Sequence, residues 1–272
     1  MQTFQHLLVD VARLGVWLVL LCVVFTPLER LFAVRPARWW RAETATHIGY
    51  YFLSSLLPAM LIAPPMALFA TALNHTLPAA WQSWADGLPA LVRWVLALVL
   101  AEIGMYWGHR WSHEWPLLWR FHSTHHAPQQ LDWLCNTRAH PVDMVFVRLC
   151  GLVPVYASGL LNASSGHSQS IGFTLITTVW GFFIHANLRW RFGVLEQVIT
   201  TPAFHHWHHT RSGAIDRNYA TMFPWIDRLF GTLHLPRDWP AAYGIDSPTP
   251  PSLVKQLVAP FVKRPTSAPV KP

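Results

Sequence analysis

Long apolar runs with few charges alternate along this chain with shorter segments rich in arginine, histidine and other polar residues. A helix needs about 20 apolar residues to cross the hydrocarbon core of a bilayer. Five runs approach or exceed that length, and we expect each to form a spanning helix: residues 12–33, 46–73, 88–107, 143–162 and 170–188. The pattern therefore predicts an all-α, multi-span integral membrane helical bundle.

Three of these runs leave questions that the pattern does not answer. The second is interrupted by Pro58, Pro64 and Pro65, so it fits either one kinked span or a re-entrant hairpin. The fourth and fifth are weaker, being rich in small and β-branched residues, and the fifth ends at His185. The first run lacks a basic start and a small-residue cleavage site, so we expect it to be retained rather than removed as a signal peptide.

The loops between the runs predict which side of the membrane each occupies. The loop between the first two runs carries Arg35, Arg38 and Arg41. The segments NHTLPAAWQSWADG and NASSGHSQS, which follow the second and fourth runs, contain no lysine or arginine. Because arginine and lysine concentrate on the cytoplasmic side, residues 35–45, 108–141 and those after 189 are predicted to be cytoplasmic. Both histidine-rich segments of the chain fall on that side.

Composition supports the membrane assignment and excludes other classes. Of the 272 residues, 52% are apolar and 12% are charged, whereas soluble domains are about a quarter charged. The formal charge is +7, but the arginines flank apolar runs as in membrane loops, so no nucleic-acid partner is expected. The three scattered cysteines contain no CxxC pair, so neither a disulfide framework nor a zinc ribbon is expected.

Histidine is concentrated in a repeated pattern. An HxxxH pair, His109 and His113, precedes FHSTHH at 121–126, and FHHWHH follows at 204–209. At this histidine content, chance predicts roughly 0.05 copies of HxxHH, and two are present. On a helix, residues three and four apart share a face, so we expect each triplet to aim three imidazoles at one small volume. His206 would point elsewhere.

Imidazoles crowded at a membrane surface predict metal binding, because they repel one another when protonated and are common metal ligands when neutral. Eight are too many for one tetrahedral zinc ion and suit two transition-metal ions. The Glu-x-x-His repeats of ferritin-like sites are absent, so the site should be nitrogen-rich. Imidazole suits Zn, Cu, Fe and Ni alike, and ligand type does not name the metal.

Two other classes of protein fit the histidine pattern less well. A membrane metal-binding or transport protein without oxygenase activity requires ligating residues inside several spans, whereas these histidines lie beyond the span ends. A hydrolytic zinc enzyme requires a carboxylate base, as in HExxH, and that spacing is absent. An apolar body suggests a lipid substrate, and oxidation of a C–H bond by dioxygen is the reaction that needs a redox metal beside an alkyl chain.

Beyond the triplets, several segments together resemble the fatty acid hydroxylase/sterol desaturase superfamily, over roughly residues 95–235. They are HRWSH (109–113), FHSTHH (121–126), RAHPVD (138–143), FIHANLRW (183–190), FHHWHHT (204–210) and NYATMFPWIDRLFGT (218–232). The resemblance implies a membrane-bound non-haem enzyme whose cytoplasmic His-rich cap holds two iron ions. Such enzymes hydroxylate or desaturate a C–H bond of a lipid or sterol with dioxygen and external electrons, and we favour hydroxylation because it needs one step fewer.

Carried over by position, the resemblance implies a set of nine ligands that are also the catalytic residues: His109, His113, His122, His125, His126, His185, His205, His208 and His209. His140 is either a tenth ligand or a residue that braces one. Arg189 stands where some relatives carry a further histidine, so Asn187 or a water is expected to complete one metal's shell. Asp227 is either a residue that orients a ligand histidine through its far nitrogen or one that makes a plain helix-terminus contact, and Asp143 is a candidate for the same orienting role at the other wall.

The chain has no CxxCH haem attachment, no GxGxxG fingerprint and no cysteine set for an iron–sulfur cluster, so a separate electron donor is implied. We expect a ferredoxin or a b-type cytochrome with its reductase, steered by an arginine-rich surface formed by Arg110, Arg120, Arg138, Arg189 and Arg191. The chain divides into N-terminal spans (1–94), a catalytic region with further spans (95–246) and a Pro-rich, flexible tail (247–272). Within the tail, LVKQLVAPFV is expected to lie on the membrane surface.

Overall fold

The computed structural model describes residues 2–38, 40–161 and 166–262. All regular elements among these residues are helices, as the sequence predicted, and an isolated bridge pairs Thr210 with Tyr243. The α-helices are α1 (Gln2–Phe32), α2 (Thr44–Thr76), α3 (Ala79–Gly87), α4 (Ala90–Glu114), α5 (Pro116–His126), α6 (Pro141–Ala157), α7 (Gly166–His185), α8 (Pro202–His208), α9 (Pro224–Leu229) and α10 (Leu253–Val262). Two 3₁₀ helices, η1 (Trp133–Thr137) and η2 (Gly193–Gln197), lie in the connections.

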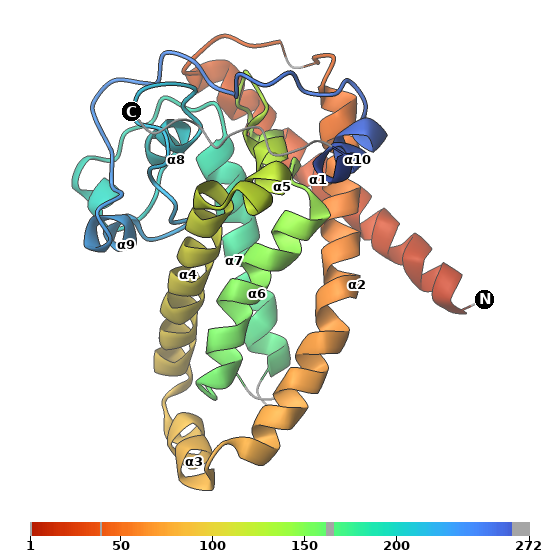
Figure 1. The fold of residues 1–272 in the computed structure, drawn as a ribbon, viewed down its shortest axis with the longest axis vertical. Helices are drawn as coiled ribbons and strands as arrows, with labels where there is room; N and C mark the ends of the chain where they lie inside the picture. The colour runs from red at the N-terminus through yellow and green to blue at the C-terminus, as the bar shows by residue number, and fades with distance from the viewer. Residues whose placement is uncertain (1, 39, 162–165, 263–272) are drawn as a thin grey trace.

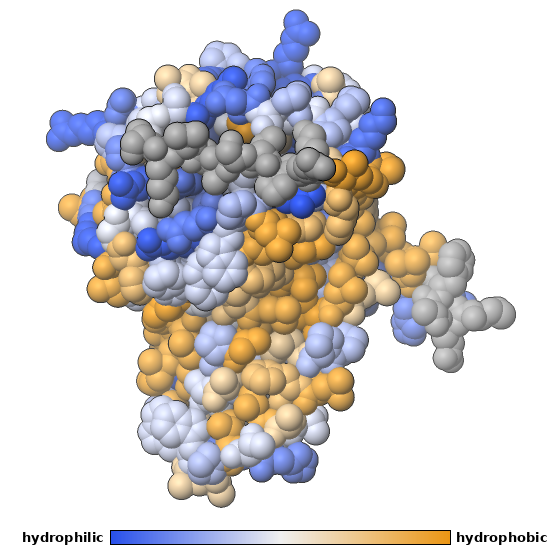
Figure 2. Space-filling model, viewed as in Figure 1, coloured by the Kyte–Doolittle hydropathy of each residue, from blue (hydrophilic) through white to orange (hydrophobic). Residues whose placement is uncertain are grey.

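Long helices form an elongated bundle that is closed at one end by a cap. Helices α2, α4, α6 and α7 run along the bundle, and α3 joins α2 to α4 at the end farthest from the cap (Figure 1). Helices α5, α8 and α9, with the connecting loops, gather at the other end, while the N-terminal part of α1 diverges from the bundle (Figure 1). The surface of the bundle is largely hydrophobic and that of the cap largely hydrophilic (Figure 2).

Three helices among the described residues are long and apolar enough to cross a membrane: Gln5–Phe32, Thr44–Leu73 and Ala90–Glu114. Helix α2 is continuous through Pro58, Pro64 and Pro65, so the second apolar run forms one helix rather than a hairpin. The fourth and fifth runs correspond to α6 and α7, which run along the bundle, and their crossing of the membrane remains a prediction. Residues 162–165, within and just beyond the fourth run, lie outside the described residues.

Helices α4 and α6 approach each other closely because small residues line their contact. A Cβ added to Gly104 would lie 2.1 Å from the carbonyl oxygen of Cys150, and one added to Gly151 would lie 3.1 Å from that of Ala101. Small residues at such positions allow helix backbones to pack directly in membrane proteins. This contact fixes the first turn of α6 beside the last turns of α4.

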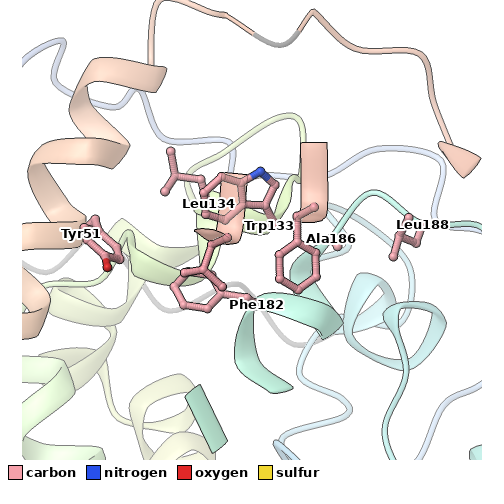
Figure 3. Close-up of a cluster of buried hydrophobic side chains, with 8 residues drawn as sticks. Tyr51, Trp133, Leu134, Phe182, Ala186 and Leu188 are labelled. Atoms are coloured by element: carbon pink, nitrogen blue, oxygen red, sulfur yellow. The ribbon is translucent and has the colours of Figure 1, made fainter. Parts of the chain in front are cut away.

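Aromatic packing joins the cap to the bundle (Figure 3). Trp133 and Leu134 of η1 pack with Phe182 of α7 and Tyr51 of α2 in one buried cluster (Figure 3). The Glu29 carboxylate of α1 accepts hydrogen bonds from the backbone N–H groups of Trp133 and Asn187. These contacts hold the end of α7, and with it His185, in a fixed position.

Four helices of the cap and the bundle begin at proline, which is well suited to the first turn of a helix because it lacks an N–H donor. Pro116, Pro141, Pro202 and Pro224 start α5, α6, α8 and α9. Helix α4 stops at Glu114, and the chain turns at Trp115 before α5 begins at Pro116. This turn directs the histidines of α5 back towards those at the end of α4.

Candidate metal centre

The nine predicted histidines converge in the cap as two adjoining groups. The first group comprises His109, His113, His122, His126 and His208, and the second comprises His125, His185, His205 and His209. Within each group, one ring nitrogen per residue lies within 4.8 Å of all the others, and every side chain is buried except that of His109, which is half-buried. Helices α4, α5, α7 and α8 supply these residues, so the centre exists only when four separate helices pack together.

The expectation that each HxxHH triplet points at one volume is wrong. His122 and His126 belong to the first group, whereas His125 belongs to the second. Likewise, His208 joins the first group while His205 and His209 join the second. Neighbouring residues on a helix point about 100° apart, so adjacent histidines of α5 and α8 reach different groups. Each group therefore takes side chains from both triplets.

Hydrogen bonds to Nδ1 fix the tautomer of most of these rings. The Nδ1–H groups of four histidines donate to backbone carbonyls: His109 to Tyr219 (2.7 Å), His125 to Arg138 (3.1 Å), His185 to Gly181 (2.7 Å) and His208 to Arg217 (2.9 Å). Two more bond to carboxylates, His122 to Asp143 (2.9 Å) and His113 to Asp216 (3.0 Å). A carbonyl can only accept, so these rings carry their proton on Nδ1 and turn an Nε2 lone pair inward.

The inward nitrogens approach one another in a way that neutral imidazoles alone do not favour. The Nε2 atoms of His125 and His185 lie 3.2 Å apart, and those of His109 and His122 also lie 3.2 Å apart. Because each of these rings donates through Nδ1, both members of each pair present a lone pair to the other. Two ligands at right angles on one ion, about 2.1 Å from it, would be about 3.0 Å apart. The spacing thus fits a shared cation.

Burial keeps the imidazoles neutral. Removal from water lowers the pKa of His125 to about 3, with the neighbouring His122 adding to the effect. Burial also lowers the pKa of His126, His205, His208 and His209 well below the usual value, and nearby imidazoles lower it further. Neutral imidazole is the form that ligates metals. The Nε2 atoms of His113 and His208 are also buried without a hydrogen-bond partner, as expected of atoms that bind an ion.

One four-residue segment, 216–219, positions three rings of the first group. It supplies the Asp216 carboxylate to His113, the Arg217 carbonyl to His208 and the Tyr219 carbonyl to His109. Asp216 and Asn218 both have left-handed backbone conformations, with φ of 58° and 60°, which asparagine and aspartate adopt more readily than other non-glycine residues. Asp216 was not predicted from the sequence, where its only signal is an Asp-x-Asn pair in the loop after the second triplet.

The side chains of Asn218 and Asp227 brace this segment. Asn218 Nδ2 donates to the carbonyls of Phe204 and His234. The Asp227 carboxylate accepts from the N–H groups of Tyr219 and Ala220. Asp227 was expected to orient a histidine directly; instead it holds the backbone whose Tyr219 carbonyl binds His109.

Of two further predicted residues, Asp143 contacts a histidine of the centre and His140 does not belong to it. Asp143 contacts a ring of the first group, since its two carboxylate oxygens accept from His122 and from Ser112. His140 lies outside both groups: its Nδ1 accepts from the N–H of Val142, and its Nε2 donates to the Leu257 carbonyl. This ring caps α6 and holds α10, so the structure gives it no role as a tenth ligand.

Asn187 was expected to complete a metal's shell, and the structure places it elsewhere. Its side-chain oxygen accepts from the N–H groups of Val34 and Arg35, and its Nδ2 donates to the Arg35 carbonyl. Asn187 therefore holds the loop after α1 against the cap. His206 points away from both groups, as expected, and bonds to the Tyr243 hydroxyl and the Ala186 carbonyl.

A third set of potential ligands, His47, Asp132 and Cys135, lies beside the centre. Two arginines already bind it, because Arg138 donates to His47 Nε2 and Arg41 pairs with Asp132. Positive charge at these positions opposes a cation. Arg138 is fully buried, so it does not belong to the predicted arginine-rich surface.

Fold and site together define a membrane-associated, all-helical protein with two adjoining histidine groups suited to metal ions. The sequence pattern of the family described as fatty acid hydroxylase matches residues 94–232. This chain belongs to the fatty acid hydroxylase family.

Curated proteins of known activity are similar to it. The chain is 36% identical to the ornithine lipid hydroxylase OlsE of Rhizobium tropici over 203 residues, covering 74% of this chain and 59% of that protein. It is 32% identical to the alkylglycerol monooxygenase of Danio rerio and 29% identical to that of Homo sapiens, covering 64% and 57% of this chain. The chain spans 36% and 33% of these two longer proteins. No solved structure matches the chain.

Proposed function

We propose that this chain is a membrane-bound, non-haem di-iron oxygenase that hydroxylates a C–H bond of a lipid. The first and second histidine groups would each hold one iron ion, and the region predicted as catalytic, residues 95–246, contains all nine predicted ligands. The relatives are named as hydroxylases and monooxygenases of lipids, which supports this substrate class.

The observation that carries the proposal is the pairing of inward lone pairs. His125 and His185 face each other at 3.2 Å, although carbonyl acceptors force the proton of each ring onto Nδ1. The same holds for His109 and His122, where a carbonyl and a carboxylate hold the protons. A cation between such rings would bind both Nε2 lone pairs, which otherwise repel each other. It would also give these buried polar atoms the partner that they require.

The protein's own residues would perform the supporting tasks. Iron at these groups would supply the activation of dioxygen that oxidation of an unactivated C–H bond requires. The acceptors of the Nδ1 protons, among them the Asp143 carboxylate and the Tyr219 carbonyl, keep each ring in one tautomer and orientation. The first group borders a cavity through His113, His126 and His208, whereas the second is enclosed by the helices. Substrate would therefore meet the centre on the side of the first group.

The proposal also includes the side of the membrane on which the centre lies and the source of its electrons. The arginine-bearing loop before α2 contacts the cap, because Arg41 pairs with Asp132 and Arg35 donates to the carbonyl of Ala241. The positive-inside rule would then place the centre on the cytoplasmic side of a multi-pass protein. A separate ferredoxin, or a b-type cytochrome with its reductase, would deliver electrons there.

Lipid analysis in isotopically heavy dioxygen tests the activity. Membranes containing the wild-type chain and a suitable electron donor should yield lipids that gain one heavy oxygen atom. The His125→Ala variant should yield none, and His75→Ala, at an exposed histidine outside both groups, should match wild type. Products with only new double bonds would refute hydroxylation, and no lipid change with a competent donor would refute the oxygenase.

A further inference from the structure

A cavity of about 360 Å³ connects the first histidine group to the C-terminal segment of the chain. His113, His126 and His208 form one end of its wall, and residues 244–250 together with α10 form the other. A water molecule occupies about 30 Å³ in the liquid, so the space holds about a dozen water-sized groups. This is enough for a lipid headgroup and a short length of chain, and too little for a whole lipid.

The wall of this cavity carries an arginine that has no hydrogen-bond or ion-pair partner among the described residues. Arg120 of α5 is half-buried beside the histidines, and its buried Nε–H has no acceptor. No described residue accepts a hydrogen bond from its guanidinium. The acidic residues of the same wall are already bound, Asp216 to His113 and Asp246 to Arg211. Arg120 is therefore a cation whose natural counterpart is an anionic group that enters the cavity.

Guanidinium chemistry selects the kind of anion. Arginine presents two parallel N–H groups that match the oxygens of a phosphate or carboxylate, and a partly desolvated pair of this kind is strong. The cavity wall also includes apolar residues, among them Trp119, Ile215 and Ala259. The site thus suits a molecule with one anionic group and an apolar continuation.

Helix α10 provides a route from the cavity to the bilayer. Gln256, Ala259 and Pro260 line the cavity, while Val254, Phe261 and Val262 on the outer side are 65–75% exposed. The helix lies beside α2 near the boundary between the hydrophilic cap and the hydrophobic bundle (Figures 1 and 2). A chain leaving the cavity along α10 would reach the apolar surface directly.

We propose that this cavity binds the headgroup of the lipid substrate, with Arg120 pairing to its phosphate or carboxylate. The inference rests on the proposed lipid oxygenase activity and adds to it the position of the oxidised carbon in the lipid. A headgroup held between Arg120 and the first histidine group places the oxidised carbon in the headgroup or in the first carbons of the chain. Carbons far along the chain lie outside a cavity of this size.

Two lipids that differ only in a phosphate test the pairing. Phosphatidic acid and diacylglycerol with identical acyl chains would be titrated into metal-loaded protein, and bound lipid would be measured by native mass spectrometry. Arg120→Met should weaken phosphatidic acid binding by about tenfold or more, since a hydrogen-bonded charge pair is lost, and should leave diacylglycerol binding unchanged. Arg120→Lys should retain part of the affinity, and Arg237→Met, at an exposed arginine outside the cavity, should match wild type.

Further measurements in the same experiment distinguish a headgroup site from a folding role of Arg120 and from a site for free anions. Equal loss of both lipids, or loss of metal in Arg120→Met, would assign Arg120 to folding and overturn the proposal. Inorganic phosphate that binds as tightly as phosphatidic acid would show a free-anion site and also overturn it. Fragmentation of any oxidised lipid should place the new oxygen near the headgroup, and a distal position would contradict the inference. Phosphate-dependent binding without turnover would support the cavity and refute only the oxygenase.

Discussion

Replacing Asp143 with asparagine isolates the contribution of a single carboxylate to the histidine centre. One oxygen of Asp143 accepts from His122 Nδ1 at 2.9 Å, and the other accepts from Ser112 at 3.1 Å, with all three residues buried. Asparagine keeps the shape and removes the charge, so His122 loses a charge-assisted hydrogen bond. Such a bond contributes about 1.5–3 kcal/mol, which corresponds to roughly 10–150-fold in metal affinity at the first group.

The assay is competition with a chelator on detergent-purified protein, with the melting temperature measured in parallel. Asp143→Asn should release metal from the first group at a lower chelator concentration, by about 10–100-fold, as for other residues that support a ligand. Ser112→Ala is the matched control, because it removes the other partner of Asp143 and leaves the bond to His122. Unchanged affinity in Asp143→Asn, or an equal change in Ser112→Ala, would refute the assigned role.

Three further predictions follow from the same contacts. Gly104→Leu should destabilise the protein by at least about 1–3 kcal/mol by separating α4 from α6, whereas Gly15→Leu, with no atom within 4 Å of an added Cβ, should keep the wild-type melting temperature. His140→Ala should keep its full metal content while limited proteolysis removes the C-terminal segment faster; loss of metal would instead make this residue a ligand. Metal-free protein should lose stability as pH falls from about 7 towards 4, because unfolded histidines, including His125, take up protons near pH 6.5 while the folded ring has a pKa of about 3. A melting temperature that rises on acidification would contradict this sign.

The sequence predicted the helices and the residues of the centre, because both depend on local patterns. Apolar length revealed α1, α2 and α4, and the spacing of His109, His113 and the two triplets placed them on helices. Which ring joins which group was not predictable, because that depends on how α5 and α8 pack against each other. Spacing along one helix brings His125 and His126 close together, but tertiary packing directs them into different groups.

The partners of the histidines were the least predictable part. Four of them are backbone carbonyls, which any residue supplies, so residue identity carries no signal for them. Asp227 was expected to orient a ligand histidine and Asn187 to complete a metal's shell, because both lie in segments that carry the family resemblance. The structure shows instead that both hold backbone segments in place. Arg138 was expected at the surface because arginine usually lies there, and pairing with His47 and Glu43 accounts for its burial.

Metal content by mass spectrometry on folded, detergent-purified protein tests the central claim most directly. The account predicts about two iron ions per chain in wild type. It also predicts none in a variant that combines His113→Ala and His208→Ala with His185→Ala and His209→Ala, two members of each group. His6→Ala with His75→Ala, at exposed histidines outside both groups, serves as the control and should keep both ions. Folded wild-type protein without stoichiometric metal after expression in iron-supplemented medium, or a quadruple variant that keeps both ions, would contradict the account.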